Sequence, residues 1–205
     1  MLLPHSSDDS SLVVLKLGGS LLSLPDLAVR VDSVIAERTR HQCLLVAGGG
    51  KAADIVRQWS EEHLLSEESA HQLALEAMAF TASLLVRLLP HAVLVSDRGQ
   101  IERARAERLL PILHSPKFLP TLERDSTIRL PHTWDATSDS IAAWVAATLR
   151  ARELVMLKSI DRHDRSWAEA ARDGAVDPYF PVLAEKIPAI RWVNLRSAAW
   201  KTPSA

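Results

Sequence analysis

The sequence predicts an α/β fold, in which short buried strands alternate with helices that pack on one sheet. Apolar, β-branched runs of strand length recur along the chain, and between them apolar residues recur at helical spacing. Two of the runs end at consecutive glycines, which is typical of a buried strand that turns sharply into a helix. At 205 residues and 47% hydrophobic content, the chain can form one sizeable core, or two halves that share a sheet.

The two glycine turns are the features around which we expect the chain to be organised. One run stops at Gly18-Gly19, and a second stops at Gly48-Gly49-Gly50. Glycines after a strand let backbone N–H groups converge, and the following helix N-terminus adds partial positive charge, so such a turn suits an oxyanion. Lys16 adds a full charge at the same place. The two turns together predict a phosphate site; the alternative is a pair of tight strand-to-helix connections.

Other kinds of site are not predicted. Gly48-Gly49-Gly50-Lys51 lacks the first glycine and the spacing of a P-loop, and neither turn fits the dinucleotide fingerprint. His63 and His71 have no carboxylate or cysteine at metal-ligand spacing, so no metal site is predicted and both are expected to be solvated or hydrogen-bonded surface groups. Cys43, the single cysteine, is expected to be a buried core residue.

Charge and composition narrow the class of protein. Lys and Arg total 24 against 25 Asp and Glu, so there is no bulk basic field to recruit nucleic acid. No apolar run approaches the ~18 residues of a membrane span. The first residues lack the basic and apolar regions of a signal peptide, so residues 1–11 are expected to be a flexible leader and residues 12–205 a single domain. With one cysteine the compartment is expected to be reducing, and the location cytoplasmic.

The remaining elements follow from periodicity. Helices are expected over residues 25–40, 52–59 and 66–89, and strands over residues 13–17, 43–47, 92–95, 109–113, 154–161 and 190–194. The first helix and its flanking strands form a βαβ unit, whose crossover should be right-handed. The run 109–113 contains proline and is expected to be an edge or short strand. Residues 98–108 are expected to be a charged excursion, residues 162–171 a charged loop with a short helix, and residues 176–181 irregular.

A dense polar stretch lies past the middle of the chain. Thr137, Ser138 and Asp139 are N-cap formers in front of an alanine-rich apolar run, so a helix begins there. Asp135 and Asp139 flank that start, and a cap with a surface acid would explain only one of them. So many short polar side chains at a loop–helix junction indicate functional residues. Further on, Lys158 follows an apolar strand, where a lysine needs an anion or an acid as its partner.

Four of these motifs together resemble the amino acid kinase family, over about positions 12–195. They are Lys16-x-Gly18-Gly19-Ser20, Gly48-Gly49-Gly50, Thr137-Ser138-Asp139-Ser140-Ile141-Ala142-Ala143 and Lys158-Ser159-Ile160-Asp161. Within the family, residues 70–78, 132–139 and 176–180 look most like the small archaeal-type aminomethylfuran-phosphate kinases of methanofuran biosynthesis, which phosphorylate an aminomethylfuran-methyl phosphate to the diphosphate. The resemblance implies a three-layer αβα sandwich with a mainly parallel central sheet, the acceptor over the N-terminal half and ATP over the C-terminal half.

The resemblance also implies an ATP-dependent kinase that uses Mg²⁺. Lys16 would hold the transferring phosphoryl group, Asp139 would orient that lysine by ion pairing, and Lys158 would act on the nucleotide side. The implied phosphate-binding residues are Gly18, Gly19, Ser20, Gly48, Gly49 and Gly50, the nucleotide-binding residues Ser159 and Asp161, and the acceptor-binding residues Trp134, Asp135, Thr137 and Ser138. Phosphoryl transfer depends on positioning and on neutralising oxygens, so such a set needs no dedicated nucleophile.

Two matters stay open at the level of sequence. Asp161 is followed by Arg162, where family members usually have glycine, so the alternative is a catalytically silent member that binds an anion or serves as a partner subunit. The acceptor, a small phosphate or hydroxyl compound, is not fixed either. Four tryptophans, Trp134, Trp144, Trp192 and Trp200, favour a homo-oligomer in which some lie at a subunit contact.

Overall fold

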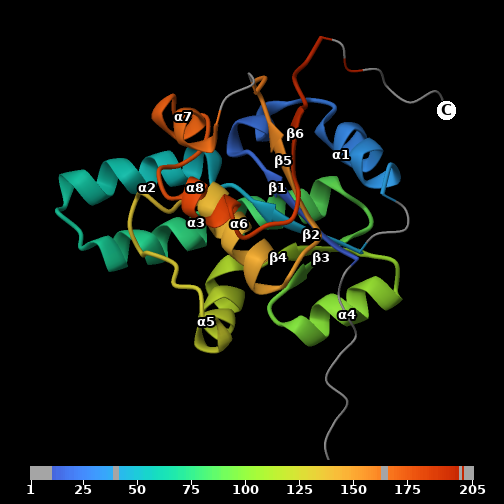
Figure 1. The fold of residues 1–205 in the computed structure, drawn as a ribbon, viewed down its shortest axis with the longest axis horizontal. Coiled ribbons are helices and arrows are strands. Elements are labelled where there is room, and N and C mark those ends of the chain that lie inside the picture. The colour runs from blue at the N-terminus through green and yellow to red at the C-terminus, as the bar shows by residue number, and fades with distance from the viewer. Residues whose placement is uncertain (1–10, 39–41, 163–165, 199, 201–205) are drawn as a thin grey trace, which may run out of the picture.

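The computed structural model describes residues 11–38, 42–162, 166–198 and 200. Apart from Ser11, the predicted flexible leader lies outside these residues. The described residues form three layers, with one sheet between helices on either face (Figure 1). None of the described helices combines the length and the apolar character needed to cross a membrane.

The sheet has six described strands, and every neighbouring pair is parallel. Their order across the sheet is β3-β4-β2-β1-β5-β6, which confirms the predicted mainly parallel sheet. The strands are β1 (Leu12–Leu17), β2 (Gln42–Ala47), β3 (Ala92–Val95), β4 (Leu110–Leu113), β5 (Glu153–Lys158) and β6 (Ile190–Asn194). The helices are the 3₁₀ turn η1 (Gly19–Ser23), α1 (Leu27–Ala36), α2 (Gly50–Glu62), α3 (Glu67–Leu88), α4 (Arg98–Ala106), α5 (Ser115–Asp125), α6 (Ser138–Thr148), α7 (Trp167–Arg172) and α8 (Phe180–Ala184).

Alternation along the strands divides the core into two apolar clusters. Leu12 and Val14 of β1 pack in the cluster that contains α6 and α8, whereas Leu15 and Leu17 pack in the cluster that contains η1 and α1. Because both faces are covered, each central strand is apolar along its whole length. Lys16 is the exception in β1, and its place in the alternation turns it toward α6.

One predicted element was wrong, one was wrong at its end, and one helix was not anticipated. Residues 98–108 contain a helix, α4, whose N-terminus is capped by the Asp97 carboxylate, which accepts from the Gln100 N–H. The helix α5, which has Pro116 in its first turn, was not anticipated. The segment 176–181, expected to be irregular, runs into the short helix α8. Each of these helices is short or proline-containing, so its periodic signal is weak. The helices expected over 25–40, 52–59 and 66–89 are present with shifted ends.

Strand β4 is an interior strand, although its proline suggested an edge. It lies between β3 and β2. Leu110 and His114 donate their N–H groups to His91 and Val95 on the β3 side, so Pro111, the alternate residue, faces β2. Proline has no N–H to donate there, and the β2–β4 ladder is correspondingly limited to the pair Leu45 and Ile112.

The long helix α3 differs from expectation in the faces that it presents. Ser66 caps it by accepting from the Ser69 N–H. Leu73, Phe80, Leu84 and Leu88, whose spacing revealed the helix, are exposed. The prediction that His71 is a surface group was wrong, because the side chain is buried.

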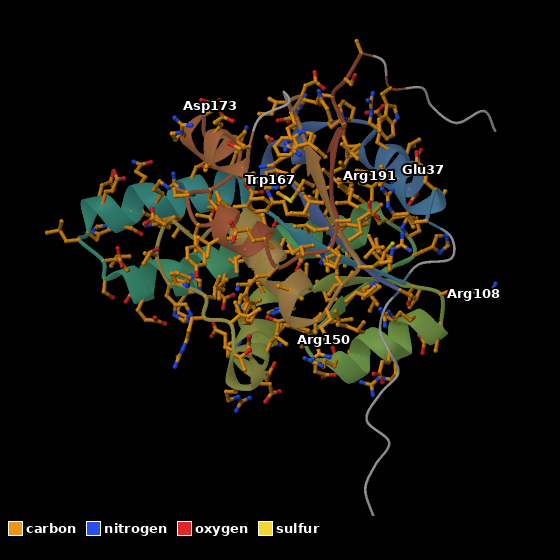
Figure 2. The ribbon with its side chains drawn as sticks, viewed as in Figure 1. Glu37, Arg108, Arg150, Trp167, Asp173 and Arg191 are labelled. Atoms are coloured by element: carbon orange, nitrogen blue, oxygen red, sulfur yellow. The ribbon has the colours of Figure 1, made fainter. Side chains whose placement is uncertain are left out.

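Trp144, one of the four candidates for a subunit contact, is fully buried in the core. Figure 2 shows charged side chains such as Glu37, Arg108 and Asp173 at the periphery.

Candidate active site

Two lysines from neighbouring strands point to the same side of the sheet. Lys16 of β1 is level with Met156 of β5, and Lys158 follows two residues later on the same face. Both strands end here, because β1 finishes at Leu17 and β5 at Lys158. Lys16 is 3% exposed. Two ammonium groups thus lie at the carboxyl edge of a parallel sheet, where the chains of α/β proteins place their ligands.

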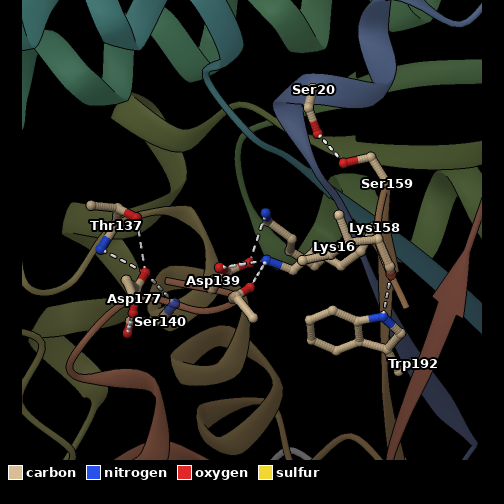
Figure 3. Close-up of polar contacts among 11 residues, drawn as sticks. Lys16, Ser20, Thr137, Asp139, Ser140, Lys158, Ser159, Asp177 and Trp192 are labelled. Atoms are coloured by element: carbon tan, nitrogen blue, oxygen red, sulfur yellow. Dashed lines mark hydrogen bonds and ion pairs between the residues drawn. The ribbon is translucent and has the colours of Figure 1, made fainter. Parts of the chain in front are cut away.

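A single carboxylate, that of Asp139, joins the two lysines (Figure 3). The Lys16 Nζ lies 2.7 Å from its Oδ1 and the Lys158 Nζ 2.8 Å from its Oδ2. Lys158 also donates to the Ala175 carbonyl oxygen, at 2.6 Å. Asp139 stands in the first turn of α6, where the helix dipole also favours a negative charge. The structure thus brings together the three residues that the resemblance implied as catalytic.

Burial and charge shift the acidities of this set. Burial by itself would raise the pKa of Asp139, but the two lysines outweigh it and the pKa is lowered, so the carboxylate stays ionised. Burial and, secondly, the charge of Lys16 lower the pKa of Lys158 to about 8. Two ammonium groups share one carboxylate, so the set is short of negative charge and favours the arrival of an anion.

Asp177 supports the start of α6 from a distant segment. Its carboxylate accepts hydrogen bonds from the Thr137 and Ser140 N–H groups, each within 3.0 Å, and from both hydroxyl groups (Figure 3). Thr137, the N-cap residue, makes no side-chain capping bond of its own. Burial and the nearby charge of Asp139 raise the pKa of Asp177. Asp177 therefore caps the helix in trans and holds the turn that carries Asp139.

The two glycine turns pack directly against each other beside the lysines. A Cβ built on Gly19 would lie 2.3 Å from the Gly50 nitrogen, and one on Gly48 would lie 2.8 Å from the Gly19 nitrogen. Gly50 also has a positive φ of 54°. Side chains here would force the backbones apart, so the glycines are needed for the contact. The N-terminus of α2 begins at Gly50 and faces the same place.

A cavity of about 750 Å³ borders the glycine turns. It is lined by seven of the predicted site residues, which are Gly19, Ser20, Gly49, Gly50, Trp134, Thr137 and Ser138. Asp139 lies on an adjoining cavity of about 650 Å³, which shares Arg57, Glu67, Trp134 and Thr137 with the first. Asp135 is exposed and lines neither of them. Its backbone carbonyl instead accepts from the Tyr179 N–H.

The predicted nucleotide residues follow Lys158 at the end of β5. Ser159 and Asp161 line a separate cavity of about 570 Å³, together with Asn194, whose side-chain amide donates to Asp161 at 2.9 Å. The Ser20 and Ser159 hydroxyl groups lie 2.9 Å apart, so the first glycine turn is tied to the end of β5 (Figure 3). His163 and Asp164, which follow Arg162 in this loop, lie outside the described residues.

Sequence reasoning missed several residues that line or support the site. Arg57 places its guanidinium 4.6 Å from the centre of the Trp134 ring, and it lines both cavities with Glu67 and Trp134. His71 lines the larger cavity. Arg57 and Glu67 are ordinary helix residues in the sequence, and no local pattern distinguishes them. Residues 176–181 were expected only to be irregular and to contribute to the resemblance, although Asp177 has a direct structural role.

A profile of the amino acid kinase family matches residues 11–162. The chain belongs to the amino acid kinase family. This membership confirms the family predicted from the four motifs. A family relative is the [5-(aminomethyl)furan-3-yl]methyl phosphate kinase of Methanocaldococcus jannaschii, which is 24% identical over 151 residues. That match covers 72% of this chain and 66% of the relative, so the chain spans a little under two thirds of the relative's length.

Solved structures of amino acid kinase proteins share the fold. The uridylate kinase of Archaeoglobus fulgidus superposes with a TM-score of 0.59 at 21% identity, over 88% of this chain and 90% of that chain. The aspartate kinase of Synechocystis gives a TM-score of 0.60 at 15% identity, over 88% of this chain and 38% of that chain. At these identities the likeness supports the αβα arrangement, and the chemistry of the chain has to be argued from its own residues.

Proposed function

We propose that this chain is an ATP-dependent kinase that transfers the γ-phosphoryl group of ATP to a small acceptor with a phosphate or hydroxyl group. The observation that carries the proposal is the arrangement of Lys16, Asp139 and Lys158 beside the two packed glycine turns. A buried set with more ammonium groups than carboxylates is costly unless an anion completes it. ATP is the phosphoryl donor of the family.

In this proposal the chain's own groups position and neutralise the migrating phosphoryl group. The N–H groups of the glycine turns and the α2 N-terminus cradle its oxygens, and the Lys16 ammonium contacts the oxygens that gain charge in the transition state. Asp139 holds both lysines in place so that they need not reorganise during the reaction. In-line placement of donor and acceptor accounts for much of the remaining barrier.

Mg²⁺ fits this proposal as part of the nucleotide. Within the described part of the chain, no three His, Cys, Asp or Glu side chains gather as a metal site. The Asp139 carboxylate is engaged by two lysines, and Asp161 accepts from Asn194. Mg²⁺ is ordinarily bound through few carboxylates and several phosphate oxygens. Bound to ATP, it would neutralise part of the charge on the phosphates.

The acceptor that we propose is an aminomethylfuran-methyl phosphate. It is supported by the name of the Methanocaldococcus jannaschii relative and by the lining of the large cavity. Trp134 offers an aromatic face for a small ring, and Lys51, next to the glycine turn, offers a cation for a phosphate. A place in methanofuran-type cofactor synthesis, and thus in one-carbon metabolism, follows from that acceptor.

The test is ADP release from Mg-ATP with a panel of acceptors. The panel contains [5-(aminomethyl)furan-3-yl]methyl phosphate, UMP, aspartate and a simple alkyl phosphate, and the product is identified by phosphorus NMR. We expect turnover with the furan phosphate and formation of a diphosphate. Absence of ADP release above the no-acceptor rate with every member would contradict the proposal that the chain is a kinase for this class of acceptor.

A catalytically silent, nucleotide- or anion-binding member is the second candidate function. Arg162 stands beside Asp161 in the predicted nucleotide loop, and Asp161 is already engaged by Asn194. A ligand that binds only the folded state raises its melting temperature. Stabilisation by Mg-ATP without turnover across the acceptor panel would favour this candidate. The predicted homo-oligomer stays a prediction, and light scattering coupled to size exclusion measures it directly.

A further inference from the structure

Two side chains of α3 line the large cavity without a polar partner of their own. Glu67 and His71 stand four residues apart, so they share one face of the helix. His71 is 6% exposed, and no residue of the described chain hydrogen-bonds to its ring. Glu67 has no ion-pair partner there either. The His71 nitrogens are not among the buried polar atoms without a partner in the described chain, so the ring opens onto the cavity, where a ligand can bond to it.

The His71 ring is held in its neutral form. Burial and, secondly, the charge of His132 lower the pKa of His71 to about 4. The two rings are stacked, with centroids 4.2 Å apart and planes 5° from parallel. At neutral pH the His71 imidazole therefore offers one nitrogen that accepts a hydrogen bond and one N–H that donates.

The second histidine is clamped between two carboxylates. His132 Nδ1 lies 2.7 Å from a Glu68 oxygen, and Nε2 lies 2.9 Å from a Glu123 oxygen. Burial alone would lower the pKa of His132, but these two carboxylates raise it. Because both ring nitrogens face carboxylate oxygens, the imidazolium, which donates from both, is the form that suits this contact. Two carboxylates outweigh its single positive charge. With Glu67 beside them and the Arg57 guanidinium on the same wall, three carboxylates stand against two cations, so this end of the cavity is net negative and attracts a cation.

The same helix reaches the phosphate end of the cavity. The Thr81 hydroxyl donates to the Gly48 carbonyl oxygen at 2.9 Å, so this part of α3 contacts a glycine turn. His71 precedes Thr81 by ten residues, which is roughly 15 Å along a helix. The cavity thus has an anion-binding end at the glycines and a cation-attracting end at His71. The space between them suits a single small ring with one arm on either side.

We infer that Glu67 and His71 bind a protonated amine at the non-reacting end of the acceptor. A primary ammonium has three donors, of which one can bond the Glu67 carboxylate and another the accepting nitrogen of His71. The inference rests on the proposed function and deepens it, because it defines the acceptor class as phosphate monoesters that carry a primary amine opposite the phosphate. His132, Glu68 and Glu123 act as positioning residues that hold His71 in place.

The experiment compares [5-(aminomethyl)furan-3-yl]methyl phosphate with its analogue that carries methyl in place of aminomethyl. Initial rates with saturating Mg-ATP at pH 7 give kcat and KM for each compound. We expect the wild type to prefer the amine in kcat/KM by about 10- to 100-fold, the range of a hydrogen bond to a charged group. Glu67→Gln and His71→Leu should each remove most of that preference by raising KM for the amine, with rates for the methyl analogue within about twofold of wild type.

Matched controls are available on neighbouring surfaces. Glu76→Gln, on an exposed position of α3 that lines neither cavity, and His63→Ala, at the end of α2, should keep the wild-type preference. Glu67 is exposed, so its variant is not expected to unfold. Calorimetry with the amine compound in the absence of nucleotide gives a second readout, in which Glu67→Gln should weaken binding by the same factor as KM.

The outcomes separate this inference from the proposed function. Turnover of both compounds with equal kcat/KM would overturn the amine site and leave the kinase intact. Loss of the preference in Asp54→Asn, with Glu67→Gln unaffected, would also overturn it, because Asp54 is another carboxylate on the cavity wall. No turnover of either compound would refute the furan phosphate as the acceptor, and the inference would fall with it, whereas the full acceptor panel decides whether the chain is a kinase.

Discussion

Among the residues that the structure describes, Lys16 has one ionic partner, the Asp139 carboxylate, which it shares with Lys158. We expect Lys16→Met to lower kcat by about 10²- to 10³-fold, the effect of removing one electrostatic contact from a transition state. Lys16→Ala should act in the same direction. The fold should persist, because the Lys158–Asp139 pair remains and methionine suits the buried site. Steady-state kinetics and a thermal melt test this, with the exposed Lys117→Met as control. A near-wild-type rate would remove Lys16 from the mechanism.

Lys158 gives the reaction a pH limit. Its pKa is lowered to about 8 by burial and by Lys16, and its charge is lost as pH rises through that value. We therefore expect kcat/KM to fall about tenfold per pH unit above about pH 8. Bound phosphates favour the ammonium, so the same limb should appear in kcat at higher pH. Lys158→Arg, which keeps its charge, should lose the limb whatever its absolute rate. A limb that is unchanged in Lys158→Arg would assign it to another group.

The contrast between His71 and His63 shows that a local pattern does not reveal which of two histidines is buried. Both histidines stand near the start of the same predicted helical stretch, yet His63 is exposed and His71 is buried against His132. The difference depends on His132, in the connection 126–137. No periodicity within α3 reveals that contact. The same holds for Arg57, whose contact with Trp134 joins two distant parts of the chain.

At the scale of elements, α6 depends on a cap supplied by another segment. We expect Asp177→Ala to lower the free energy of unfolding by about 1–2 kcal/mol, because the Thr137 and Ser140 N–H groups lose their acceptor. It should also lower kcat, since Asp139 stands in the same turn. Urea unfolding and steady-state kinetics measure the two effects.

Asp97 provides a matched control for that prediction. Its carboxylate caps α4, away from the lysines, by accepting from the Gln100 N–H. Asp97→Ala should cost a similar free energy of unfolding and leave kcat unchanged. If both variants lose stability but neither loses turnover, the cap on α6 is structural only.

Elements were predicted well where an apolar repeat extends over many residues, or where an apolar strand ends at glycines. Strands β1 and β2 and the helix α3 are such cases. Helix α4 was missed because it is short and few of its residues are apolar, and it was Asp97 that set its start. Strand β4 was predicted to be an edge or short strand; it is short, with 4 residues, but not at an edge, because the neighbouring strands fix the side on which Pro111 lacks its N–H.

At the scale of the whole molecule, the two ends of the sheet differ in role, because one holds the candidate active site and the other a buried ion-pair group. Glu153, at the start of β5 and 7% exposed, contacts buried Arg38 at 3.4 Å and Arg191 of β6 at 3.1 Å. This ion-pair group lies at the opposite end of the strand from Lys158. We expect Glu153→Gln to lower the free energy of unfolding by about 3 kcal/mol, because among the described residues the buried Arg38 guanidinium then keeps only the exposed Glu37 carboxylate, 3.6 Å away. KM and kcat should not change.

The control for Glu153 is Glu37, whose exposed carboxylate lies 3.6 Å from the same arginine. Glu37→Gln should change the free energy of unfolding by less than about 1 kcal/mol, because exposed pairs contribute little. Chemical denaturation measures both variants. A large change in KM for Glu153→Gln would show that the two ends of the sheet are coupled.

By itself, the sequence determined the α/β class, the two glycine turns, the start of α6 and the order of motifs that identifies the amino acid kinase family. These are local patterns, because a strand, a cap or a glycine turn is specified by residues close together in the chain. Only the tertiary structure decided that one carboxylate serves both lysines, that Asp177 caps α6, and that His71 lies against His132 on the cavity wall. Those contacts join segments far apart in the chain, and their geometry exists only once the strands are in register and the helices are packed.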